Sequence, residues 1–107
     1  MKYYLMIWDV KLASRGYDGC IFKIDIPVPV AKFFFELNAL EYPVLSSLSF
    51  DDYDLFSGPE IDGLVDELLS TVRLNPLVSE TVSSMVNLIA NAKSLEKHVL
   101  FDPFRVG

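Results

Sequence analysis

Residues 57–73 have the periodicity of an amphipathic helix, and sequence signals mark both its start and its end. Apolar residues recur there at intervals of three and four, which places them on one helical face. Ser57 and Glu60 have the spacing of a capping box, Pro59 suits the first turn, and Arg73 suits the C-terminal end. Such a helix must bury its apolar face, so it constrains every fold that the chain can adopt. The predicted apolar face consists of Ile61, Leu64, Val65, Leu68, Leu69 and Val72.

A second amphipathic helix is predicted to begin at Asn75, where Pro76 follows a plausible cap. Its periodicity fades near Lys93. The expected apolar positions are Val78, Val82, Met85, Val86 and Ile89. Two long helices of this kind would cover one face of a small sheet.

The strands are predicted from shorter patterns. Residues 2–10 are apolar and aromatic, which is typical of a strand buried on both faces, and residues 13–19 read as a loop. Cys20–Ile26 alternates and is able to pair with the first strand as a hairpin, while His98–Asp102 reads as a final strand. A third strand is expected within residues 44–50.

The segment 30–40 is compatible with a strand or a short helix, and we favour the helix. Together these elements predict one globular domain over residues 1–107 in the α+β class. We expect a small, mainly antiparallel sheet of three to four strands packed against two long amphipathic helices.

Composition excludes several classes of function. A net charge of −6 disfavours direct binding to nucleic acid or to an anionic membrane, because both need clustered bases. The longest charge-free run, residues 81–92, is too short to span a bilayer. Cys20 is the only cysteine, so no internal disulfide forms. We expect a soluble, cytoplasmic protein.

The charge is unevenly distributed. Seven acids and no base lie between Asp51 and Glu67, and the rest of the chain has 8 acids and 9 bases. Glu60 and Asp62 suit the first turn of a helix, where negative charge is favoured. The other five acids have no such local explanation. A solvated surface is one interpretation, and a surface for a basic partner is the other.

Tyr53 lies between two of these acids and is expected to be exposed, whereas Phe50 and Phe56 are expected to anchor the loop in the core. Tyrosine beside carboxylates is a common composition of protein-binding hot spots. The predicted partner-binding residues are Asp51, Asp52, Tyr53, Asp54, Asp66 and Glu67.

No constellation predicts catalysis. The aspartates that start at Asp52 lack the later oxygen ligands of a calcium loop. His98 is the only histidine, no nucleophile elbow surrounds a serine, and Cys20 lies inside a strand pattern. We therefore expect no enzyme, no metal and no cofactor.

Three segments resemble small bacterial immunity proteins of polymorphic toxins, including contact-dependent growth inhibition toxins. They are residues 42–45 (Tyr-Pro-Val-Leu), the acidic turn 51–56 followed by the helix 57–73, and the ending 99–104. The resemblance implies a non-catalytic cytoplasmic inhibitor that binds one toxin domain, for which a basic nuclease is a candidate. Three alternatives stay open: a nucleic-acid mimic, a structural or oligomeric subunit, and a ligand-binding domain. Both a monomer and a homodimer remain compatible with the sequence.

Overall fold

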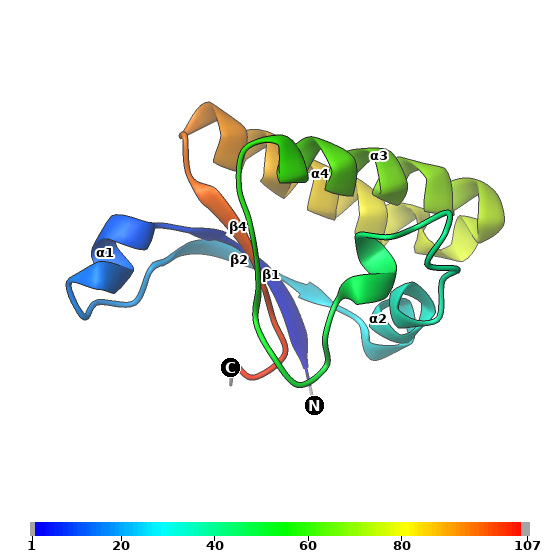
Figure 1. Ribbon diagram of the computed structural model, residues 1–107, viewed down its shortest axis with the longest axis horizontal. Coiled ribbons are helices and arrows are strands. Elements are labelled where there is room, and N and C mark those ends of the chain that lie inside the picture. Colours follow the sequence, from blue (N-terminus) through cyan, green and yellow to red (C-terminus); the bar gives the residue numbers. More distant parts are fainter. Residues whose placement is uncertain (1, 106–107) are drawn as a thin grey trace.

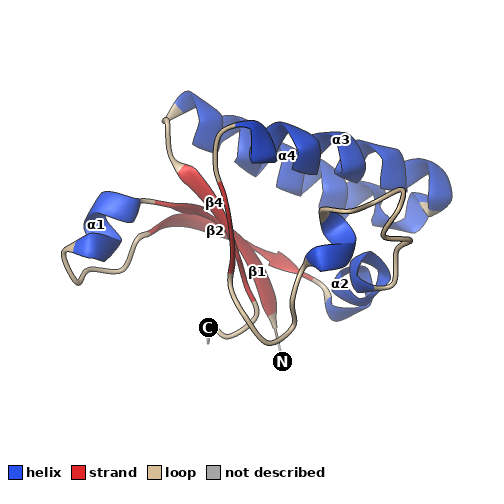
Figure 2. Ribbon diagram, viewed as in Figure 1, coloured by secondary structure: helices blue, strands red, loops and turns tan. Residues whose placement is uncertain are grey.

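The computed structural model describes residues 2–105 and has an α+β architecture, as the sequence predicts. One antiparallel sheet of four strands has the order β2-β1-β4-β3. Both long helices, α3 and α4, lie on the same side of this sheet (Figures 1 and 2). The elements are β1 (Tyr3–Trp8), α1 (Val10–Ser14), β2 (Cys20–Ile26), α2 (Val28–Phe35), η1 (Leu45–Ser47), β3 (Asp54–Phe56), α3 (Pro59–Leu74), η2 (Pro76–Val78), α4 (Ser79–Ser94) and β4 (His98–Asp102).

β1 is a central strand buried on both faces, which confirms the interpretation of its apolar run. Tyr3, Leu5 and Ile7 belong to the main core, to which α3 and α4 also contribute. Tyr4 and Met6 alternate with them and join Leu100 in a smaller cluster. The predicted hairpin of β1 with β2 is also confirmed. The sheet therefore has an inner face toward the helices and an outer face with its own small core.

The two long helices bury most of their predicted apolar faces. In α3, Leu69 is an exception at 54 % exposed, and Thr71 is buried in its place. The Thr71 hydroxyl donates to the Leu68 carbonyl at 2.6 Å, so this buried polar group is satisfied. α4 buries Leu88 and Ala92 in addition to its predicted stripe, because it contacts both α3 and the sheet.

Two predicted features differ from the structure near the acidic stretch. Residues 44–50 do not form a strand, since the 3₁₀ turn η1 lies there and the third strand is β3. The N-cap of α3 is Gly58 with a φ of 55°, a backbone conformation that favours glycine. The capping box does not form. The Ser57 hydroxyl contacts the Glu60 carboxylate at 3.5 Å, and no side chain caps a backbone amide at this helix start.

Two further differences concern the N-terminal half. The predicted loop 13–19 begins with the last residues of the short helix α1, which Asp9 caps by accepting from the amides of Lys11 and Leu12. Within the segment 30–40 the favoured helix forms only over residues 30–35, because α2 starts at Val28 and ends at Phe35. Within residues 2–105, no helix combines the length and apolar character that a bilayer crossing needs.

Candidate partner-binding surface

The six residues predicted to bind a partner do not form one continuous surface. Asp51, Asp52 and Tyr53 lie in the loop between η1 and β3, which reaches the end of the molecule where β1 begins and β4 ends (Figure 1). Asp66 and Glu67 lie on α3, along the opposite side of the molecule in the same view. The structure therefore separates the acids that are neighbours in sequence.

Glu67 is engaged in the fold. Its carboxylate accepts hydrogen bonds from the Val44 amide at 3.0 and 3.1 Å and from the Leu45 amide at 2.9 Å. These two amides lie at the start of η1, which is not part of the sheet. No side chain at the start of η1 caps these amides, so the Glu67 carboxylate caps them from α3. Glu67 thereby holds η1, which leads to the acidic loop, against α3.

Asp54 also turns toward the protein. Its Oδ2 accepts from the Ser49 amide at 2.9 Å, which closes the loop that contains Asp51 and Asp52. Burial raises the pKa of the Asp54 carboxyl, the Ser49 amide lowers it in part, and Asp52 raises it further. The charged form of Asp54 is therefore less favourable in the folded chain than in the unfolded chain.

We expect Asp54→Asn to be at least as stable as the wild type at pH 7. A carboxyl with a raised folded pKa contributes its full stability below its unfolded pKa and loses it as pH rises through the folded pKa. Asparagine keeps an acceptor for the Ser49 amide and cannot ionise, so the gain at pH 7 should be under about 1 kcal/mol. Urea unfolding of both proteins at pH 3 and pH 7 measures it. A variant that is less stable than the wild type only at pH 7 would show that the charge stabilises the loop.

The exposed end of the loop combines acids with aromatic rings. Asp51 and Asp52 are exposed, and no base within residues 2–105 forms an ion pair with either of them. Tyr53 is 52 % exposed, as expected, and its ring packs edge-on against Phe104 with centroids 5.2 Å apart. Phe104 is itself 49 % exposed. We call Asp51, Asp52, Tyr53 and Phe104 the tip surface.

The two phenylalanines of this loop have different positions. Phe56 is buried in the main core, which agrees with its predicted anchoring role. Phe50 is 59 % exposed, and its ring lies 6.4 Å from that of Phe35, which packs against the main core. Its predicted burial is wrong, because the loop is closed by the Asp54 hydrogen bond to Ser49 and not by this side chain.

A hollow of about 410 Å³ opens beside the tip surface on the outer face of the sheet. Leu55 and Leu100 are paired across β3 and β4, with Leu100 buried and Leu55 half exposed. We call this space the outer hollow, and its lining residues are Trp8, Tyr53, Leu55, Leu100, Asp102 and Arg105.

An ion cluster borders the outer hollow. Arg105 donates to both carboxylate oxygens of Asp18, at 2.8 and 2.9 Å, and its Nε lies 3.6 Å from Asp102 Oδ2. The Arg105 guanidinium holds the pKa of the Asp18 carboxyl far below its usual range. Asp102 Oδ1 accepts from the amides of Phe104 and Arg105. These bonds fasten the C-terminal segment to the loop between α1 and β2, and they were not predicted from the sequence.

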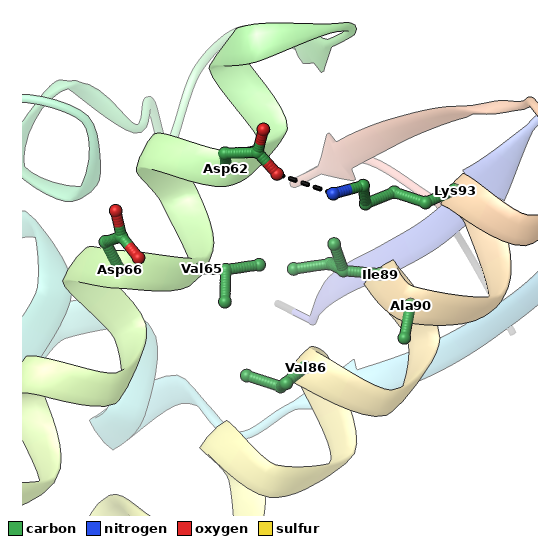
Figure 3. A pocket seen from close by; sticks show the side chains of 7 residues that line it. All are labelled: Asp62, Val65, Asp66, Val86, Ile89, Ala90 and Lys93. Atoms are coloured by element: carbon green, nitrogen blue, oxygen red, sulfur yellow. Dashed lines mark hydrogen bonds and ion pairs between the residues drawn. The ribbon is translucent and has the colours of Figure 1, made fainter.

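Asp66 lies on a separate feature, a groove of about 350 Å³ between α3 and α4. Figure 3 shows the apolar side chains of Val65, Val86 and Ile89 facing one another there. Lys93 of α4 pairs with Asp62 of α3 at 2.6 Å, so a base on the neighbouring helix offsets this acid. Asp66 forms no ion pair with the described residues and remains at the rim.

Among residues 2–105, neither the His98 nor the Cys20 side chain forms a hydrogen bond with another residue. His98 opens β4 opposite Trp8 of β1. Burial raises the pKa of the Cys20 thiol, which keeps it protonated near neutral pH. Among residues 2–105, no three His, Cys, Asp or Glu side chains are grouped in a way that would hold a metal ion.

Comparison with protein-family models, with curated proteins and with solved structures found no match for this chain. The tip surface and the outer hollow are therefore interpreted from their own geometry.

Proposed function

We propose that this chain is an immunity-type protein, which binds and neutralises a cognate basic toxin domain through the tip surface. The observation that carries the proposal is the half-exposed Tyr53, which lies beside unpaired Asp51 and Asp52 and packs on Phe104. Aromatic anchors beside unpaired charges are typical of interface hot spots. The resemblance of the acidic turn to immunity proteins supports the same function.

The distribution of the other acids strengthens this assignment. Glu67, Asp54 and Asp62 have partners inside the molecule, so folding or helix packing accounts for them. Asp52 accepts only from the amide of the adjacent Tyr53, at 2.8 Å, and neither Asp51 nor Asp52 has a basic partner among the described residues. Unpaired acids at an exposed loop attract a basic protein over distances of about a Debye length. The tip surface is thus the part of the acidic stretch that a partner best explains.

The test is to express the protein encoded by the neighbouring reading frame of the source genome, to ask whether it is toxic and whether this chain protects cells against it, and to measure the affinity of the purified pair. We expect Asp51→Lys/Asp52→Lys to weaken binding by about 100-fold, mainly through slower association. Protection should fall in parallel. The wild-type affinity should also decrease as salt increases, because exposed charges are screened.

Glu36→Lys/Glu80→Lys is the matched control, since it changes the net charge equally at two exposed acids of other elements. It should bind nearly as well as the wild type. Equal losses in both double variants would mean that only net charge matters. Full affinity in the Asp51→Lys/Asp52→Lys protein, with normal folding, would remove the tip surface from the interface.

A further inference from the structure

The outer hollow has the composition of a side-chain pocket. Its walls are the rings of Trp8 and Tyr53 and the aliphatic side chain of Leu55, and Leu100 forms part of its buried base. Pockets that bind a side chain or small ligand are mostly apolar with a few polar groups. Here Asp102 and Arg105 are those polar groups.

Asp102 is almost fully buried, at 3 % exposed, yet its Oδ2 accepts no hydrogen bond from the described residues. The nearest cation is Arg105 Nε at 3.6 Å, and this Nε–H is itself buried without an acceptor. Among the described residues, Asp102 Oδ2 thus has only this ion pair, and a bound group that donates to it would add a hydrogen bond to a charged acceptor. The hollow therefore has a carboxylate acceptor beside its apolar side chains.

The charges around the hollow favour a cation. Arg105 is shared by the two carboxylates of Asp18 and Asp102, so its own charge is already offset. Asp51 and Asp52 add two exposed negative charges next to Tyr53. Aromatic faces such as those of Trp8 and Tyr53 also attract guanidinium and ammonium groups.

We infer that the outer hollow receives one arginine or lysine side chain of the basic partner, an inference that rests on the proposed function. The aliphatic stem of that side chain packs against Trp8, Leu55 and Leu100, and its charged head donates to Asp102 Oδ2. Long basic side chains commonly bury their stems in this way while the head meets a polar group. Asp51 and Asp52 attract the side chain to the hollow from the tip surface.

Trp8 is the only tryptophan of the chain and lines the hollow, so its fluorescence reports on occupancy. The probe is an acetylated hexa-arginine peptide, with hexa-glutamate as the negative control, titrated in 0.05 and 0.15 M salt. We expect saturable binding of hexa-arginine with a change in Trp8 emission, and none with hexa-glutamate. Absence of saturable hexa-arginine binding in 0.05 M salt would overturn the inference.

The decisive variant is Leu55→Thr, which removes an apolar side chain from the lining of the hollow without changing the charge. Threonine is well tolerated in an edge strand such as β3. It should bind hexa-arginine about tenfold more weakly, because the stem loses apolar contact. Leu69→Thr is the matched control, since Leu69 is also about half exposed but lies on α3 away from the hollow. It should bind as the wild type does.

The outcomes separate this inference from the proposed function. If Asp51→Lys/Asp52→Lys loses affinity for hexa-arginine and the toxin domain while Leu55→Thr loses none, the partner uses the tip surface alone and the hollow is not a pocket for it. If Leu55→Thr and Leu69→Thr lose affinity equally, the hollow assignment is also overturned. If neither the charge reversal nor Leu55→Thr weakens binding, both proposals fall.

Discussion

Phe101→Ala is expected to lower the free energy of unfolding by about 3–5 kcal/mol, the typical cost of removing a buried phenylalanine side chain. Phe101 is fully buried in β4. Its ring stacks on Tyr3 with centroids 5.8 Å apart and meets Phe35 edge-on at 6.2 Å. The cavity would therefore open between the sheet and α2, where several rings lose a neighbour. Urea unfolding monitored by circular dichroism measures the loss.

Phe104→Ala is the matched control for that prediction, because it removes the same side chain three residues later. Phe104 is 49 % exposed and contacts Tyr53. We expect a loss below about 1 kcal/mol in stability, together with weaker binding of the partner. Similar losses of stability in both variants would contradict the assignment of Phe101 to the core and Phe104 to the tip surface.

Glu67→Ala is expected to lower the free energy of unfolding by about 2–3 kcal/mol, although the residue looks like surface charge in the sequence. The variant leaves the amides of Val44 and Leu45 without the carboxylate that accepts from them. Hydrogen bonds to a charged group contribute more than neutral ones, and part-buried donors are costly to leave unpaired. Thermal and urea unfolding would both show the loss.

Two control variants test whether the lost hydrogen bonds cause this decrease in stability. Asp66→Ala removes the adjacent acid, which is exposed and forms no ion pair within the described residues, so stability should stay within about 0.5 kcal/mol. Glu67→Gln keeps one oxygen acceptor and should fall between the wild type and Glu67→Ala. If Asp66→Ala and Glu67→Ala are equally stable, the hydrogen bonds to η1 contribute nothing measurable.

The elements with strong periodicity were predicted well because their pattern is local. The apolar stripe of α4 and the alternation in β2 both depend on residues a few positions apart. β2 formed where expected, whereas α4 begins at Ser79 and the predicted start of its helix is the 3₁₀ turn η2. Predictions failed where local patterns compete. Residues 44–50 have an apolar composition suited to a strand, but the Glu67 carboxylate binds their first amides and η1 results.

The candidate site was predicted in part. The exposure of Tyr53 followed from its position between two aspartates, and the structure places it in the tip surface. Its neighbour Phe104 and the outer hollow had no sequence signal, since they come from segments about fifty residues apart that only the sheet unites. Phe50 was expected in the core and is exposed, because the loop closes through Asp54.

By itself, the sequence determined the α+β class, the two long helices and the concentration of acids in one stretch, because periodicity and charge are readable from neighbouring positions. Only the tertiary structure decided what each acid does. Glu67 meets amides 22 and 23 residues away, Asp62 meets a base 31 residues away, and Asp18 meets Arg105 across 87 residues. Such contacts depend on how distant elements pack, and this packing leaves Asp51 and Asp52 beside Tyr53 without a basic partner among the described residues.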